Sequence, residues 1–453
     1  MKNYSFKPTD ENALEFLKTD PIRRNVYVQR FIQMLTRMED DCYTVALNGD
    51  WGSGKTFFVK QVKMLLDASN PQSKMDAAIR QNILDCRGGA SYPESYATVY
   101  YDAWACDNHE DPILSLVYAA LKSGLGEVSQ GKTPSVIKTA MTVFDAIKGT
   151  NLTALCNMSK DLHTEDLTTI IEKTENLKGN IRKFIDSLIH EKGNRLIIFV
   201  DELDRCKPDY AIHLLERIKH YFDDDRITFV FSVNLTQLQW TVKGYYGSNF
   251  DATKYLEKFF DFQFAIPYAD YKRFLWDRLN LNSDSITEHI CTAVIRQFDF
   301  SLRQSERYVR IMKIVGVNDA CENAISQEDK ATAFVGEYIM PILVGLQMYN
   351  LDVYYEFKAG RNAEPMIKIL SNPEIPKCRF LLEQRETFAA DGVIPSSSSG
   401  YVVMKDRLQT AYDALFLKTD RIKVGQMTFT DRTRAYLNET ESMLIPDGNF
   451  DFE

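Results

Sequence analysis

Five short runs of apolar and β-branched residues punctuate the first part of the chain, and helical patterns separate them. Continuous runs of this kind are typical of strands buried on both faces of a parallel sheet. Their alternation with helical segments predicts an α/β fold with a doubly wound parallel sheet. The predicted strands are Cys42–Leu47, Thr98–Trp104, Leu196–Val200, Ile227–Val233 and Phe260–Ile266.

The segment between the third and fourth predicted strands has the pattern of a helix packed on such a sheet. Its apolar residues recur at helical spacing and form a single stripe. Pro208 suits the first turn, where a missing N–H costs no hydrogen bond. The stripe consists of Ala211, Leu214, Leu215, Ile218 and Phe222.

The spacing of the strands predicts the domain organisation. Residues 1–120 and 194–267 hold the two parts of the sheet domain. Residues 121–193 are too many for one crossover helix, and their helical spacing predicts a helical insertion. The remaining chain is mostly helical, with residues 268–330 next to the sheet domain and residues 331–453 forming a C-terminal region of unknown role.

Composition indicates an ordinary globular protein. The chain has 453 residues, of which 45% are hydrophobic and 26% charged, enough for about two or three domains. A net charge of −9 and a pI of about 5.4 argue against non-specific binding of nucleic acid by the whole surface. The overall charge is compatible with a basic groove on part of the surface.

Cysteine usage and hydropathy predict a cytoplasmic protein without a transmembrane segment. None of the eight cysteines forms a C-x-x-C pair, and the start of the chain has no secretory pattern. No apolar run reaches the roughly 18 residues that a spanning helix needs. The nearest candidate, Tyr338–Leu346, is predicted to be a core helix.

The most informative motif follows the first predicted strand and precedes a helical segment. It matches the P-loop pattern G-x-x-x-x-G-K-[ST], in which backbone N–H groups cradle phosphates. Lys55 is expected to reach the β- and γ-phosphates, and the Thr56 hydroxyl to ligate Mg²⁺. An accidental glycine-rich turn is the alternative. The expected nucleotide-binding residues are Gly49, Asp50, Trp51, Gly52, Ser53, Gly54, Lys55, Thr56 and Phe57.

A second motif, typical of Walker B, ends the third predicted strand with two carboxylates. Asp201 is expected to hold Mg²⁺ through water, and Glu202 to act as the base that deprotonates the attacking water. The alternative is a surface acidic pair. A glutamate at this position favours hydrolysis and implies an extra strand, Ile227–Val233, between the strands of the two motifs. Asn234 at its tip is a candidate γ-phosphate sensor, with a helix N-cap as the alternative.

Several strings together resemble the KAP family of P-loop NTPases, named after a neuronal membrane scaffold and a plasmid-encoded phage-exclusion protein. The tryptophan in the P-loop and the D-E-L-D-R-C string are the most distinctive. The similarity covers roughly residues 20 to 315. The strings that carry it are Asn48–Thr56, Tyr101–Trp104 with Asp111-Pro112, Val200–Cys206, Tyr255–Pro267 and Leu302–Arg307.

The resemblance implies a magnesium-dependent ATPase with an AAA+-like core, a helical lid over residues 268–330 and ATP-promoted homo-oligomerisation. By this similarity Arg303 would reach the γ-phosphate from the lid, and Lys258 would act on a neighbour's nucleotide. Arg205 is a further candidate for that cationic role, or it braces Asp204. Ordinary salt bridges are the alternative for Arg303, Lys258 and Arg205.

The chain departs from the family pattern at two places. Many members carry transmembrane helices between the Walker motifs, whereas charged residues interrupt the insertion here, so membrane attachment is not expected. Asn234 stands where an aspartate is frequent. The interrupting residues are Lys138, Asp145, Lys148 and Lys160.

Three functions compete. The first is an ATPase that switches conformation or assembly in bacterial anti-phage defence, with a partner protein or a phage component as trigger. The defence role rests on the family resemblance alone. The second is an ATP-binding signalling scaffold that hydrolyses ATP weakly. A nucleic-acid-dependent motor ranks last, because basic clusters with interleaved aromatic residues are not evident. Glu202 favours the first over the second.

Overall fold

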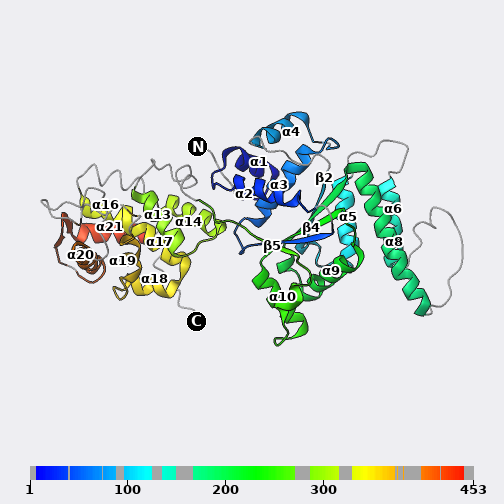
Figure 1. Cartoon of the computed structure of the whole chain (residues 1–453). Coiled ribbons are helices and arrows are strands. Elements are labelled where there is room, and N and C mark those ends of the chain that lie inside the picture. Colours follow the sequence, from blue (N-terminus) through cyan, green and yellow to red (C-terminus); the bar gives the residue numbers. More distant parts are fainter. Residues whose placement is uncertain are drawn as a thin grey trace. The chain divides into compact units, whose positions relative to one another are not determined.

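The computed structural model consists of two compact units, Lys7–Tyr268 and the chain from Ala269 onward (Figure 1). The first holds the sheet predicted from the sequence. The structure describes residues 7–38, 41–73, 75–87, 96–124, 135–148, 167–270, 286–315, 329–372, 375, 381, 399–418 and 420–442.

A five-stranded parallel sheet forms the centre of the first unit, in the order β2-β3-β4-β1-β5. The doubly wound α/β fold is confirmed, and so is the extra strand, because β4 lies between β1 and β3. Two strand ends were predicted too long, since the chain leaves β2 at Asp102 and enters β5 only at Phe262. The strands are β1 (Tyr43–Asn48), β2 (Tyr96–Asp102), β3 (Arg195–Asp201), β4 (Ile227–Val233) and β5 (Phe262–Ala265).

Helices cover both faces of this sheet, as Figure 1 shows. Two separate apolar clusters, one on each face, account for the packing. One face is covered by α1 (Asp10–Thr19), α2 (Asn25–Leu35), α3 (Lys55–Ser69) and α4 (Ala77–Leu84). The other is covered by α5 (Pro112–Gly124), α6 (Ser135–Lys148), α8 (Leu167–Lys192), α9 (Pro208–Tyr221), α10 (Leu235–Tyr246) and α11 (Ala252–Leu256).

The predicted stripe of α9 is buried against the sheet, and Pro208 opens the helix as expected. The described helices of the 121–193 stretch, α6 and α8, bury their apolar faces in the same cluster as α9 and the strands. These two helices are therefore an extension of the sheet domain's own core.

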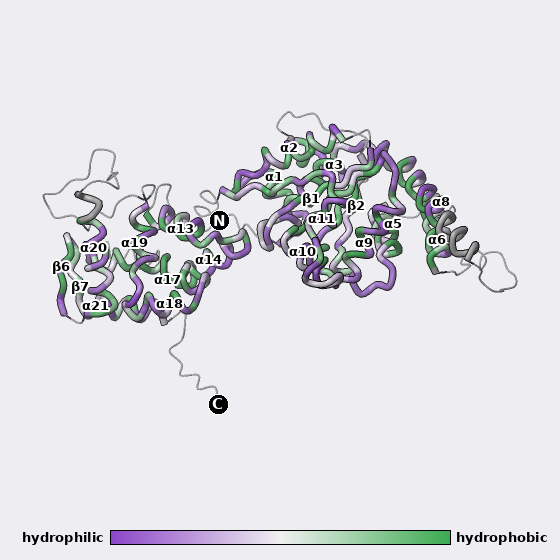
Figure 2. Tube along the Cα trace, turned by 60° about the horizontal axis from the view of Figure 1, so that its bottom comes forward, coloured by the Kyte–Doolittle hydropathy of each residue, from purple (hydrophilic) through white to green (hydrophobic). Residues whose placement is uncertain are grey.

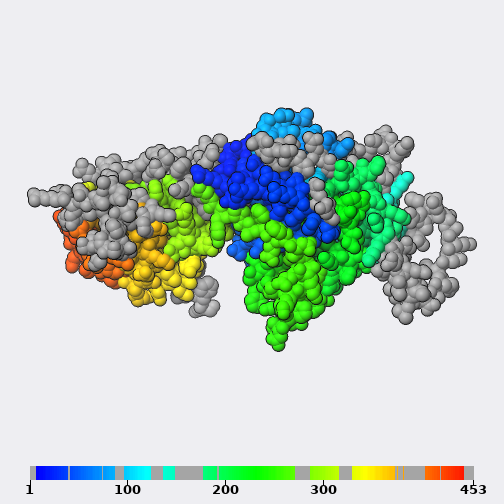
Figure 3. All heavy atoms as spheres, viewed as in Figure 1, coloured from blue at the N-terminus to red at the C-terminus, as the bar shows by residue number. Residues whose placement is uncertain are grey.

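Figure 3, viewed as Figure 1, shows the green residues of α10 and the following turn projecting from the first unit.

The second unit is mostly helical. One element in it was not predicted: β6 and β7 pair antiparallel around Gly425, whose φ of 56° a residue with a side chain rarely adopts. Strands of three residues are too short to show a period. The elements are α13 (Ile286–Gln297), α14 (Leu302–Ile314), α16 (Lys330–Phe334), η4 (Val335–Ile339), α17 (Met340–Tyr349), α18 (Leu351–Lys358), α19 (Glu364–Leu370), α20 (Ser399–Phe416), β6 (Ile422–Val424), β7 (Met427–Phe429) and α21 (Asp431–Ser442).

Among the residues that the structure describes, one helical stretch is long and apolar enough to cross a membrane. Lys330–Tyr349 spans 20 residues; an 18-residue segment of it has a mean hydropathy of 1.3, and 89% of that segment is buried inside the unit. A buried core helix passes the same test, and the segment Tyr338–Leu346 does lie in the core. Figure 2 shows hydrophilic and hydrophobic residues alternating along most other helices.

Candidate nucleotide-binding site

The two Walker motifs and Asn234 lie together at the carboxyl-terminal edge of the sheet. Asp201 ends β3 opposite Ser232 of β4, and the P-loop leaves β1 directly beside β4. The amide of Gly49 donates a hydrogen bond to the carbonyl of Val233 over 3.2 Å. Ligands of open α/β sheets bind at this edge. The two motifs and Asn234 lie at the tips of neighbouring strands, where the sequence predicted them.

The P-loop glycines are required by the backbone. Gly54 precedes α3 with a φ of 90°, and Gly52 has a φ of 80°; both lie in the left-handed region. At Gly49, an added Cβ would lie 2.3 Å from Cγ2 of Ile266, just beyond β5. The helix that begins at Lys55 directs its free N–H groups toward the loop, which suits a phosphate.

Lys55 lies folded over this loop. Its Nζ donates to the carbonyl oxygens of Gly49 and Asp50 over 2.6 and 3.1 Å. Burial lowers the pKa of the Lys55 amine, and the carboxylates of Asp204 and Asp201 partly offset that effect. The residue is only 9% exposed, so its ammonium group is held where a phosphate oxygen would replace the two carbonyl partners.

The polar groups around the loop fit a magnesium-bound nucleotide. Asp201 is 1% exposed; its Oδ2 accepts from the Tyr100 hydroxyl over 2.9 Å and its Oδ1 from the Glu202 amide over 3.0 Å. Within the described residues, the Thr56 hydroxyl makes no hydrogen bond, and the hydroxyls of Ser53 and Ser232 are buried without a partner. Oxygen donors of this kind are the ligands that Mg²⁺ prefers.

Glu202, the expected base, is paired with Arg205. Its Oε1 lies 3.2 Å from Nη1 of Arg205, whose guanidinium lies over the Trp104 ring at 5.4 Å from the centroid. Partial burial raises the pKa of Glu202; Arg205 opposes this, while Asp201 and other neighbouring aspartates add to it. The backbone of Glu202 is left-handed, with a φ of 58°. Such strain is common in functional sites.

Asn234 caps a helix and also contacts the P-loop. Its Oδ1 accepts from the Gln237 amide over 3.2 Å and caps α10. Its Nδ2 donates to Oδ1 of Asp50 in the P-loop over 3.1 Å. The N-cap is therefore observed, and the side chain also contacts the loop; its sensor role stays a prediction.

Sequence reasoning missed two residues of the site. Arg24, just before α2, is buried and donates from Nη1 to the carbonyl of Ser53 over 2.6 Å. Tyr100 donates its hydroxyl to Asp201. The sequence offers little that singles out either residue. Arg24 lies far from the P-loop along the chain, and nothing in the sequence distinguishes Tyr100 from the other two tyrosines of β2.

The remaining cationic candidates belong to different units: Lys258 to the first and Arg303 to the second. Lys258 is exposed after α11, and Asp261, three residues later, pairs with Thr44 near the start of β1. Lys258 therefore lies near the opposite edge of the sheet from the P-loop. Arg303 is exposed on α14 in the second unit, and its predicted contact with the γ-phosphate stays a prediction.

Comparisons with known proteins agree with this site. A search of curated proteins gave no significant match. The family model for the KAP family P-loop domain matches residues 24–316, which include the P-loop, Asp201 and Arg24. This match extends over more than half of the chain. The chain therefore belongs to the KAP family of P-loop NTPases.

Proposed function

We propose that the protein is a magnesium-dependent ATPase that uses ATP binding and hydrolysis to switch its conformation or assembly. The observation that carries this proposal is Glu202, a carboxylate of raised pKa directly after Asp201 and beside the P-loop. A group of this kind can take a proton from water at the γ-phosphate. A P-loop that only binds nucleotide has no need of it.

The residues divide the work as follows. The P-loop amides and Lys55 bind the phosphates and orient them. Thr56 and Asp201 would hold Mg²⁺, which neutralises charge on the β- and γ-phosphates when bound. Tyr100 fixes the Asp201 carboxylate by donating to its Oδ2. Glu202 takes the proton of the attacking water, after Arg205 has released its carboxylate.

A second candidate function, an ATP-binding scaffold with weak hydrolysis, draws on the same ion pair. While Arg205 holds Glu202, the base is turned toward a guanidinium instead of a water. In the ATPase switch, ATP binding or a neighbouring subunit separates the Glu202–Arg205 pair. In the scaffold, the pair stays in place. We favour the switch, because a partly exposed ion pair contributes about 1 kcal/mol or less and is easily exchanged.

The wider role of the switch follows from two arguments. Lys258 is exposed near the opposite edge of the sheet, where only a neighbour's nucleotide could meet it, which supports ATP-promoted homo-oligomers. The family resemblance supports anti-phage defence in a bacterial cytoplasm, with a partner protein or a phage component as trigger. Addition of DNA or RNA to the assay tests the motor alternative.

The deciding experiment is a single-turnover ATP assay with the full chain, with Mg²⁺ and with EDTA. We expect magnesium-dependent phosphate release by the wild type. Glu202→Gln should bind ATP but release phosphate at least about 100-fold more slowly. Wild-type hydrolysis by Glu202→Gln would refute the base assignment, and equal, very slow turnover of both proteins would support the scaffold.

A further inference from the structure

The outward face of α14 is a row of arginines. Arg303, Arg307 and Arg310 lie four and then three residues apart, the spacing that places side chains one above the other on a helix. All three are exposed. The row is directed away from the core of the second unit, because the residues that α14 buries lie on its opposite side. They are Leu302, Ser305, Tyr308, Val309 and Met312.

Most of the charge of this row is not neutralised within its own unit. No described residue forms an ion pair with Arg303 or Arg307. Arg310 lies 3.0 Å from a carboxylate oxygen of Glu306, but its side chain is 68% exposed, so this pair is easily exchanged.

The sign of the charge on α14 is opposite to that of the whole protein. The helix carries four basic residues, with Lys313 as the fourth, and one acidic residue, Glu306, which gives a formal charge of +3. The chain as a whole has a net charge of −9. Basic residues gathered on one face of an acidic protein indicate a binding surface for an anion.

The spacing of the row fits a regular line of single negative charges. From Arg303 to Arg310 the helix rises about 10.5 Å, at about 1.5 Å a residue. One strand of duplex DNA presents a phosphate about every 3.4 Å along the axis, so about three phosphates lie along this length. Arginine also suits a phosphate better than lysine, because its planar fork donates two parallel hydrogen bonds.

Other partners fit this face less well. Membrane-surface helices direct an apolar face into the lipid, whereas the apolar face of α14 is buried in the unit. Protein interfaces are built around large anchoring side chains, and α14 exposes a single large apolar one, Ile314 in its last turn. Single-stranded nucleic acid is bound by stacking bases on aromatic rings, and the one aromatic residue of α14, Tyr308, is buried. A duplex needs neither an apolar face nor a ring.

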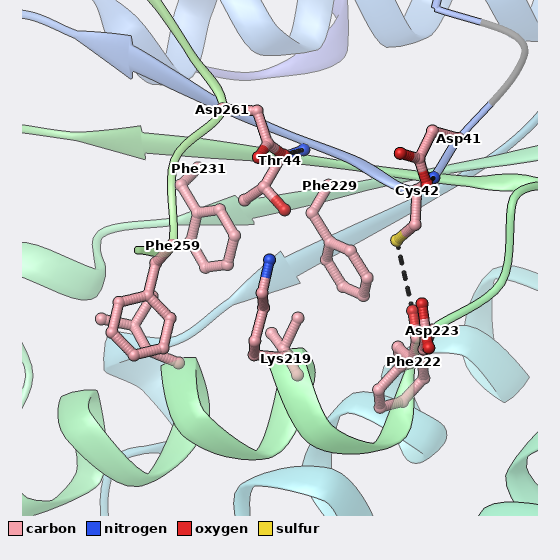
Figure 4. A pocket seen from close by; sticks show the side chains of 12 residues that line it. Asp41, Cys42, Thr44, Lys219, Phe222, Asp223, Phe229, Phe231, Phe259 and Asp261 are labelled. Atoms are coloured by element: carbon pink, nitrogen blue, oxygen red, sulfur yellow. Dashed lines mark hydrogen bonds between the residues drawn. The ribbon is translucent and has the colours of Figure 1, made fainter. Parts of the chain in front are cut away.

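A hollow in the first unit shows the opposite charge pattern (Figure 4). It lies between α9 and the sheet, and Asp41, Asp223 and Asp261 line it together with a single lysine, Lys219. Three carboxylates against one ammonium group would repel a polyanion. This edge of the first unit is therefore not a second candidate for the same partner.

We propose that the outward face of α14 binds the phosphate backbone of duplex DNA without regard to its sequence. Arg303, Arg307 and Arg310 donate to successive phosphates of one strand, and Glu306 gives up Arg310 to the DNA. Contacts to phosphates position a protein on a duplex but carry no base information. This binding lies beyond the proposed ATPase activity, because it needs neither ATP nor hydrolysis.

Fluorescence anisotropy with the full-length protein, a labelled DNA duplex and no nucleotide tests this binding. We expect a Kd of about 10⁻⁴ M or tighter at about 50 mM salt, as for non-specific DNA binding. A plot of log K against log salt concentration should have a slope of about −2.7, because each of three phosphate contacts contributes about −0.9.

Two double variants locate the surface. Arg307→Gln/Arg310→Gln should weaken binding at least about tenfold and reduce the slope to about −0.9, since one contact remains. Arg303 stays unchanged in this variant, because it is also the candidate for the γ-phosphate contact. Arg421→Gln/Lys423→Gln removes two exposed charges at β6 of the same unit and is the matched control, which should keep the wild-type slope.

The proposal is wrong if the wild type does not bind the duplex, or if the slope is the same in both double variants. It is also wrong if single-stranded DNA or phosphatidylserine vesicles bind more tightly than the duplex through the same two arginines. Loss of ATP affinity in Arg307→Gln/Arg310→Gln, with duplex binding intact, would assign the row to the nucleotide instead. Circular dichroism of each variant establishes that a loss of binding is not a loss of fold.

Discussion

The indole nitrogen of Trp51 donates a hydrogen bond to Oδ2 of Asp204 over 2.6 Å, which joins the P-loop to the loop after Asp201. Both residues belong to the strings that mark the family resemblance. Asp50 is tied to Asn234 and Ser53 to Arg24, so the P-loop is attached to three other segments of the first unit. Tethers of this kind hold the loop in its binding geometry before a ligand arrives.

Trp51→Phe keeps a ring but removes the N–H donor. We expect kcat/KM for ATP hydrolysis to fall about tenfold, because a hydrogen bond to a charged group contributes about 1.5–3 kcal/mol and this one is partly exposed. Steady-state kinetics measure the effect. Trp240→Phe, at an exposed tryptophan on α10, is the matched control. Equal kinetics of Trp51→Phe and the wild type would show that the tether has no role in turnover.

Arg205→Met should shift the pH dependence of turnover. Glu202 acts as a base only when deprotonated, so kcat/KM falls as the pH drops through the pKa that Glu202 has in the free enzyme, where it is paired with Arg205. Arg205 lowers that pKa, and its loss therefore raises it and moves the acid limb to higher pH. The shift is expected to be small, because the pair is partly exposed and therefore screened by solvent.

Arg205→Lys is the control for this shift, since it keeps the charge and should leave the limb near its wild-type position. The plateau rate is a separate readout: it falls if Arg205 also contacts phosphate during turnover. A limb that moves to lower pH in Arg205→Met would contradict the assigned effect of Arg205 on Glu202.

Arg24→Met should weaken nucleotide binding, because the Ser53 carbonyl loses the donor that orients the loop. A loss of about tenfold or more in ATP affinity is expected for a charged donor. Arg24→Lys should recover part of it, since a lysine supplies one donor without the planar fork. Arg30→Met, an exposed arginine of α2, serves as the control. Unchanged affinity in Arg24→Met would remove Arg24 from the site.

Gly49→Ala should lower both the melting temperature and the ATP affinity, because the new methyl group meets Ile266 at 2.3 Å. The double variant Gly49→Ala/Ile266→Ala removes that contact and should regain part of both. Gly179→Ala, in α8, has open space around its Cβ position and should be neutral or slightly stabilising. Failure of the double variant to regain anything would point to Ser53, the other close neighbour, as the cause.

The sequence was sufficient for the sheet and the two Walker motifs, because each is encoded by contiguous residues with a clear period or spacing. The sequence did not predict the contacts made by Arg24 and Tyr100, or the hydrogen bond between Trp51 and Asp204. These contacts join residues that are distant in the chain, and their partners depend on how helices and strands pack. The β6–β7 pair was missed for a different reason, since its strands are too short for a period.

Lys258 is expected to supply a cation to the nucleotide of a neighbouring subunit. The P-loop, Mg²⁺ and Glu202 neutralise only part of the charge of the transferring phosphoryl group, and a further cation is worth about 10³-fold or more in related enzymes. Lys258 is exposed near the opposite edge of the sheet from its own P-loop, so it would serve a neighbour's nucleotide. Lys258→Ala alone should therefore lose most of its turnover and keep ATP binding.

Mixing tests this directly. Glu202→Gln supplies Lys258 but lacks the base, and Lys258→Ala supplies the base but lacks the cation, so a mixture should turn over faster than either protein alone. Mixing Lys258→Ala with Lys254→Ala is the control for dilution and assembly, because Lys254→Ala should supply Lys258 normally. If the mixture of Glu202→Gln and Lys258→Ala shows only the average of its components, while sizing with ATP shows a monomer, Lys258 does not act between subunits. Arg303, on the same chain, would then be the better candidate for the added cation.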